Sequence, residues 1–267
     1  MHAIKCEYLL NNKKYLGVAG MSPFSYSEVP WHVREDIPKA YQAYWRKLAS
    51  PGSWWTGAER VAIAAESRKA LTCDFCKARK KSLSPYKFDG AHQCDSDLPA
   101  VVVDAIHRVI TDQARITQAW VNDNVTRGIT KEAYVELVGV VVTVFSIDEF
   151  HRALGLPVEA LPTPAPGEIS RYRPTIVRED IGFVPTIPAD GNVGNETDIW
   201  DGVRAANVIR ALTLVPQALK DWRAIGNVQY LTFDAMSNFA KDDHRAINRL
   251  QMELIAGRVS SINECFY

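Results

Sequence analysis

The stretch "TKEAYVELVGVVVTVFSIDEFHRAL", residues 130–154, constrains the fold more than any other part of the sequence. It is rich in β-branched residues, which favour strands, but strands are usually only about 3–10 residues long. Its polar residues recur at helical spacing instead of alternating. We therefore predict one long helix here. Its most apolar run, 136–145, is too short to cross a bilayer, which takes about 20 apolar residues.

Helical patterns recur along the rest of the chain, whereas strand signals are sparse. Ala40, Tyr44 and Leu48 mark one apolar helical face, and Thr56 with Glu59 predicts a capped helix start near residue 58. These patterns predict an all-α fold. The predicted helices cover residues 35–50, 58–71, 73–81 (with Thr72 as the cap), 98–111, 114–126, 130–154, 207–231 and 244–263. In the last of these, Ile247, Leu250, Leu254, Val259 and Ile262 form an approximate apolar stripe.

A proline-rich stretch divides the chain. Residues 155–195 hold seven prolines and show no convincing period, which is typical of a connector that lies on the surface. A chain of 267 residues is long enough for two packed units. We therefore predict a first unit at 1–155, a connector at 156–195 and a second unit at 196–267.

The charge balance and the cysteine count limit the class of protein. Lys plus Arg and Asp plus Glu both total 31, so the formal net charge is zero, and this argues against nucleic acid as the main partner. The N-terminal segment lacks the apolar stretch of a signal peptide. Five cysteines, an odd number, argue against a disulfide framework. We expect a cytoplasmic protein that binds neither nucleic acid nor membrane.

Cys73 and Cys76 form a Cys-x-x-Cys pair at a predicted helix start. The positive end of a helix and the basic run "CKARKK" lower the pKa of a thiol, and this spacing lets two sulfurs form a disulfide after one has reacted. The pair therefore predicts thiol redox chemistry. Two alternatives remain: a tetrahedral zinc site made by Cys73, Cys76, His92 and Cys94, or two inert, buried cysteines.

Proton transfer at such a pair needs a base. Glu66 lies seven residues before Cys73 on the preceding helix, within reach of the sulfurs. His92, in the loop after the pair, and His151, at the end of the long helix, are candidate proton shuttles. His107 falls on a mostly apolar helical face, and we expect it to be a hydrogen-bonded core histidine.

The segment around the cysteines has an echo near the end of the chain. "AERVAIAAESRKALTCDFC" and "QMELIAGRVSSINECFY" share a Glu, an Ala- or Ile-rich helical turn, a Ser, a short joint and a Cys. In the second copy these positions include Glu253 and Cys265. One more residue after Tyr267 would be the second cysteine of that copy.

These motifs resemble the AhpD-like family of alkylhydroperoxidase D and the carboxymuconolactone decarboxylases, and more narrowly its tandem branch of alkylhydroperoxidase-related selenoproteins. The resemblance implies an AhpD-like helical fold, with a complete first unit and a second unit cut at its motif. It implies that Cys76 attacks peroxide and Cys73 resolves the product, with Glu66 as the base. Glu253 and Cys265 would be the matching Glu and resolving cysteine of the second copy.

The resemblance also implies the reaction partners. They are a hydroperoxide substrate and a thiol or lipoyl-type reductant, with no cofactor, in a homo-oligomer. Two positions where the family carries histidine hold Phe75 and Lys80 here, so His92 or His151 would have to replace them. The alternative function is a decarboxylase-like or non-catalytic helical protein. The end at Tyr267 suggests a UGA codon for selenocysteine at position 268, with a shortened chain as the alternative.

Overall fold

The computed structural model describes residues 23–30, 32–94, 96–200, 205–232, 235–236, 238 and 245–263. In these residues every regular element is a helix, and an isolated bridge joins Arg178 to Thr186. The all-α prediction is therefore confirmed for the described part of the chain. The elements are α1 (Asp36–Ala49), α2 (Gly57–Ala70), α3 (Asp74–Lys81), α4 (Ala100–Thr111), the 3-10 turn η2 (Gln113–Arg115), α5 (Gln118–Thr126), α6 (Lys131–Ala153), the 3-10 turn η3 (Gly194–Glu196), α7 (Asn207–Arg210), α8 (Pro216–Gln229) and α10 (Arg249–Ile262).

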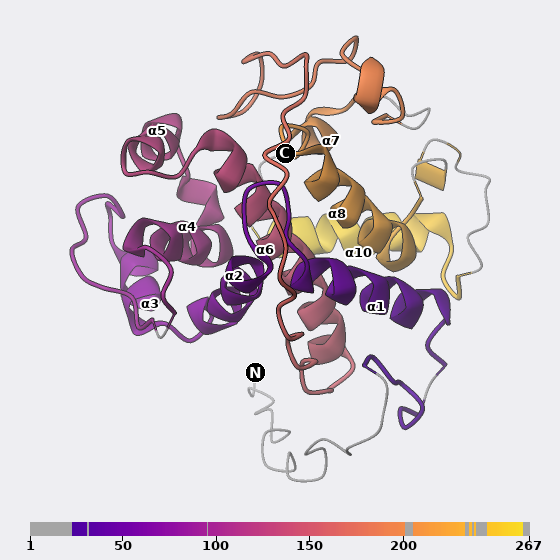
Figure 1. The fold of residues 1–267 in the computed structure, drawn as a ribbon. Coiled ribbons are helices and arrows are strands. Elements are labelled where there is room, and N and C mark those ends of the chain that lie inside the picture. The colour runs from indigo at the N-terminus through magenta and orange to yellow at the C-terminus, as the bar shows by residue number, and fades with distance from the viewer. Residues whose placement is uncertain are drawn as a thin grey trace.

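Helix α6 is the centre of the molecule and is the long helix that the sequence predicts. It packs against α2 and α4 on one side and against α8 on the other (Figure 1). Thr130 caps it by accepting a hydrogen bond from the Ala133 N–H at 3.1 Å. The apolar run of α6 supplies core: Val141 and Val144 are fully buried. Across the described residues, no helix has both the length and the apolar character that a membrane crossing requires.

Helix α2 begins with the capping box that the sequence predicts. The Thr56 hydroxyl accepts from the Glu59 N–H, and the Glu59 carboxylate accepts from the Thr56 N–H at 2.8 Å. This reciprocal pair satisfies two of the N–H groups that a helix start leaves open. It fixes the first residue of the helix that carries Glu66.

Three boundary predictions are corrected. Thr72 does not cap α3, because its hydroxyl donates back to the Lys69 carbonyl and Cys73 is the N-cap residue instead. The predicted helix at 114–126 is a 3-10 turn followed by α5, which Thr117 caps. The stretch 207–231 divides into α7 and α8, because Pro216 can begin a helix but disfavours the helical conformation in the residue before it.

The last helix, α10, is much more exposed than its apolar stripe predicts. Leu250 and Leu254 are both 76% exposed, and Met252 is the buried residue of the helix. Glu253 lies on the same helix, where it accepts hydrogen bonds from Tyr230 and Arg249.

The proline-rich stretch lies against the first helices. The N–H groups of Ala165, Ser170 and Arg171 donate to carbonyls of residues 49, 52 and 53, and the Trp45 indole donates to the Ala160 carbonyl. Figure 1 shows this stretch passing in front of α6 on its way to α7. The segment therefore packs along the helices without forming a helix of its own until η3.

The close packing of α6 against α8 can be tested with two glycine substitutions. A Cβ added at Gly139 of α6 would lie 2.8 Å from the Ala218 Cβ, whereas one added at Gly226 of α8 would meet nothing within 4 Å. Alanine is preferred over glycine in helices by about 1 kcal/mol, but overpacking costs about 1–3 kcal/mol. We expect Gly226→Ala to be more stable than Gly139→Ala by about 1–3 kcal/mol.

Urea unfolding measures the free energy of unfolding of each variant. The two values can be compared directly because both variants replace a helical glycine with alanine. Equal free energies of unfolding would contradict the close approach of α6 and α8.

Candidate functional site

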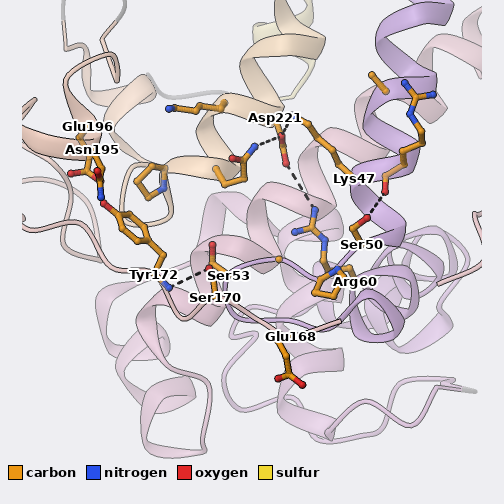
Figure 2. Close-up of a pocket in the computed structure, with 17 residues that line it drawn as sticks. Lys47, Ser50, Ser53, Arg60, Glu168, Ser170, Tyr172, Asn195, Glu196 and Asp221 are labelled. Atoms are coloured by element: carbon orange, nitrogen blue, oxygen red, sulfur yellow. Dashed lines mark hydrogen bonds and ion pairs between the residues drawn. The ribbon is translucent and has the colours of Figure 1, made fainter. Parts of the chain in front are cut away.

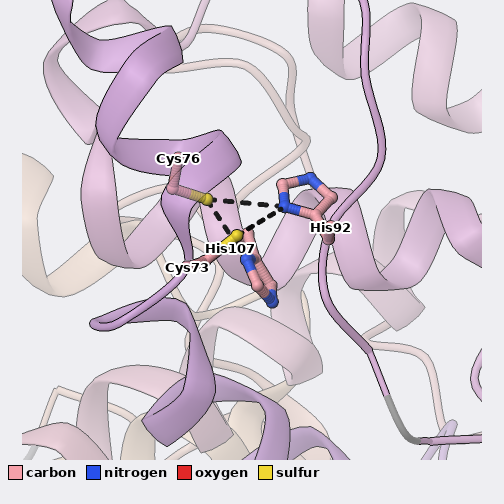
Figure 3. A group of neighbouring side chains, drawn as sticks. All are labelled: Cys73, Cys76, His92 and His107. Carbon is pink, nitrogen blue, oxygen red and sulfur yellow. Dashed lines mark hydrogen bonds between the residues drawn. The ribbon is translucent and has the colours of Figure 1, made fainter.

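The two cysteines lie at the start of α3. Cys73 is the N-cap residue and Cys76 is in the first helical turn, and the two are 2% and 1% exposed. Both are free thiols. Their sulfurs lie together, facing two histidines (Figure 3). The helix start and the spacing of the pair therefore gather both sulfurs at one buried point.

His92 reaches this point from the loop between α3 and α4. Its Nδ1 lies 3.6 Å from the Cys73 Sγ and 3.4 Å from the Cys76 Sγ. Gly90 lets the loop approach: its φ is +155°, and a Cβ there would lie 2.4 Å from the Phe75 ring. The Phe75 ring in turn packs edge-on against the His92 imidazole, with centroids 4.9 Å apart. A residue other than glycine at position 90 would clash with the Phe75 ring unless the ring or the loop shifted.

His107 comes from the middle of α4 and completes the cluster. Its Nδ1 lies 3.2 Å from the Cys76 Sγ, and its Nε2 lies 2.8 Å from the Glu66 Oε1. His107 and Glu66 are 0% and 1% exposed. His107 is hydrogen-bonded in the core, as expected from the sequence, but it also belongs to the cysteine cluster. Glu66 therefore reaches the sulfurs through a histidine that the sequence analysis did not place in the site.

A second carboxylate holds the other histidine. The Asp104 Oδ1, on α4, lies 2.9 Å from the His92 Nε2 and also accepts a hydrogen bond from Arg79. The Arg79 side chain is buried, and its Nη2 lies 3.9 Å from the Cys76 Sγ. Each imidazole thus presents Nδ1 to sulfur and Nε2 to a carboxylate.

The electrostatics of the cluster favour charge separation between sulfur and imidazole. Burial raises the pKa of the Cys73 thiol, but hydrogen bonds from the Cys76 backbone and from His92 outweigh burial and bring that pKa to about 7. Burial lowers the pKa of His92, but its bonds to Asp104 and to both sulfurs raise it to about 10. The pKa of His107 is lowered, chiefly by burial, against the opposing effect of Glu66.

The other candidate residues lie elsewhere. His151 bonds to the Tyr26 hydroxyl at 2.8 Å and to the Pro157 carbonyl at 2.7 Å. The Cys94 sulfur contacts Glu66 Oε2 at 3.5 Å and Ser96, and it is not part of the group formed by the two cysteines and two histidines. Glu253 is on α10, and Cys265 is outside the described residues.

A pocket of about 1010 Å³ adjoins the cluster. His92, Arg79 and Phe75 are part of its lining, and its other aromatic side chains are Tyr86, Phe88 and Trp120. Two of these lining residues, His92 and Arg79, also contact the Cys76 Sγ.

A second pocket, of about 840 Å³, lies between α1, α8 and the proline-rich stretch and has no cysteine in its lining (Figure 2). Lys47 and Arg60 both point to Asp221 in this view, at 2.6 and 4.0 Å. On the opposite wall Tyr172 donates a hydrogen bond to Glu196. Asp221 therefore pairs with two of the basic side chains that line this pocket.

The arrangement around Cys76 can support two kinds of chemistry. A thiol beside an imidazole that a carboxylate orients has the geometry of an activated nucleophile. Two cysteine sulfurs and two imidazole nitrogens are also a tetrahedral ligand set for a soft or borderline metal ion. No protein-family model, curated protein or solved structure matches the chain. The resemblance to the AhpD-like family therefore rests on the sequence motifs alone.

Proposed function

We propose that the chain is a thiol-dependent hydroperoxide reductase of AhpD-like type, with Cys76 as the attacking sulfur and Cys73 as the resolving sulfur. The observation that carries this proposal is the convergence of both imidazoles on the Cys76 Sγ, at 3.2 and 3.4 Å. Cys73 contacts one of the two, His92. Cys76 is thus the sulfur that has both a proton acceptor and a proton donor within reach.

Each step conserves atoms and electrons. His107, held by Glu66, takes the proton of Cys76 as a general base. The thiolate attacks the hydroxyl oxygen of the hydroperoxide: an S–O bond forms, the O–O bond breaks, and His92 gives a proton to the departing alkoxide, which leaves as the alcohol. Cys73 then attacks the sulfenic sulfur, so that an S–S bond forms and water leaves. The sum is one hydroperoxide and two thiols converted to alcohol, water and one disulfide, which an external dithiol then reduces.

The hydroperoxide would reach Cys76 from the pocket that His92 lines. The lining of this pocket combines aromatic side chains with charged ones such as Arg108 and Asp123, and Arg79, which also lines it, lies beside the attacking sulfur. Glu66 and His107 are buried next to Cys76 and do not line this pocket. Substrate therefore approaches past His92, while the proton acceptor remains shielded from water.

Mass spectrometry of the zinc-free, reduced protein tests the proposal. Tryptic peptide 70–77 carries both cysteines and no other, so disulfide formation removes two hydrogens from a single peptide. One equivalent of hydroperoxide should convert this peptide to the disulfide in wild type. In Cys73→Ser, a dimedone adduct should form on Cys76, because no resolving thiol remains.

The matched variant is Cys76→Ser, in which the remaining Cys73 should stay unmodified at the same peroxide dose. If Cys73 is trapped there while Cys76 in Cys73→Ser is not, the two roles are reversed. If peptide 70–77 stays reduced in wild type, the proposed function is wrong.

A further inference from the structure

We propose that Cys73, Cys76, His92 and His107 bind one Zn²⁺ ion in the reduced protein. This zinc site goes beyond the proposed redox function and does not depend on it. It also differs from the ligand set that the sequence suggests, because His107 takes the place of Cys94.

Three sulfur–nitrogen distances among the four ligand atoms are close to those around one tetrahedral ion. With Zn–S near 2.3 Å and Zn–N near 2.0–2.1 Å, tetrahedral ligands lie roughly 3.3–3.8 Å from one another. The cluster has sulfur–nitrogen distances of 3.2, 3.4 and 3.6 Å, and all its ligand atoms lie within 4.8 Å of one another. Small side-chain movements are enough to bring all four atoms to zinc.

The second layer of contacts also fits zinc. Histidines that bind a metal usually give their other ring N–H to a carboxylate, which orients the ring. Here Glu66 holds the Nε2 of His107 at 2.8 Å, and Asp104 holds the Nε2 of His92 at 2.9 Å. Both rings therefore have Nδ1 free to face the metal position, and both do face the two sulfurs.

The charges and the burial favour a closed site. Two thiolates balance the charge of Zn²⁺, and the Arg79 guanidinium balances Asp104 through its hydrogen bond. Cys73, Cys76 and His107 are buried, and the His92 side chain is 8% exposed. A four-ligand site without an open position is typical of a structural or storage zinc site.

Zinc on this site has a consequence for the sulfurs. Two thiolates bound to zinc are not free to form a disulfide with each other, so zinc should protect the pair from peroxide. This consequence, unlike zinc binding itself, rests on the proposed function.

Metal analysis of the full chain tests the inference under reducing conditions and without peroxide. After incubation with excess Zn²⁺ and gel filtration, wild type should retain one zinc per chain. His107→Gln and Cys76→Ser should each lose it, while Cys94→Ser should retain it, because a serine at that position keeps a hydroxyl to donate to Glu66. Asp104→Asn should keep all four ligands but bind zinc roughly 10–100-fold more weakly.

Co²⁺ gives a readout that does not depend on the yield of folded protein. A cobalt-loaded wild type should show the visible bands of a tetrahedral ion and a sulfur-to-metal charge-transfer band, and the latter should weaken in Cys73→Ser. Wild type that retains no zinc, or a Cys94→Ser variant that loses zinc while His107→Gln keeps it, would overturn the site. Neither result bears on whether peroxide forms the disulfide in the zinc-free protein. The zinc site can therefore be disproved without disproving the proposed function, and the reverse also holds.

Discussion

Glu136→Ala should lower the free energy of unfolding by about 3–5 kcal/mol, which is the usual effect of removing one partner from a buried ion pair. Glu136 of α6 accepts from Arg60 of α2 at 2.7 Å and from the Trp54 N–H at 2.6 Å. The Arg60 and Glu136 side chains are only 6% and 3% exposed. Without the carboxylate, the guanidinium stays buried with Asp221 as its nearest remaining anion, at 4.0 Å.

Denaturant unfolding followed by circular dichroism measures this loss. Glu35→Ala is the matched control, because Glu35 is paired with Lys39 in an exposed ion pair, and such pairs contribute little. Its unfolding midpoint should match wild type. A double variant, Arg60→Met with Glu136→Leu, should recover most of the stability, since it removes both buried charges together. If the double variant is no more stable than Glu136→Ala, the lost charge pairing is not the cause.

Local signals explain the parts of the fold that the sequence predicts. Helix α6 and the capping box at Thr56 depend on residues within a few positions of one another, where period and cap chemistry are readable. The same holds for the Cys-x-x-Cys pair at the start of α3. By contrast, the exposed stripe of α10 depends on what packs against it, which periodicity does not encode.

The composition of the cluster depends on which helices pack together. Glu66 is on α2 and His107 is on α4, and the contact arises because these two helices pack face to face. One signal was available: both residues interrupt apolar helical faces, and buried polar groups need partners. The sequence does not encode locally that α2 packs against α4, so it does not predict this pair. The same holds for Asp104, which reaches the sulfurs through His92 and Arg79.

His107→Gln should slow the oxidation of Cys76 by hydroperoxide by about 10²–10⁴-fold, the usual contribution of a general base. The glutamine can fill the space and donate a hydrogen bond, but it cannot take the thiol proton. The rate is best measured as dimedone trapping of Cys76 in single turnovers, in zinc-free protein that carries Cys73→Ser. This background isolates the first chemical step from disulfide formation.

Two further variants separate proton transfer from packing. Glu66→Gln keeps the size of the side chain and a hydrogen bond to His107 but removes the negative charge, so a purely structural contact predicts an unchanged rate, whereas a charged relay predicts a slower one. His151→Gln is the control, because His151 bonds to Tyr26 and Pro157 and lies outside the cluster. Its rate should equal that of the parent. Equal rates in His107→Gln and the parent would remove His107 from the reaction and leave His92 as the only imidazole beside the attacking sulfur in the described residues.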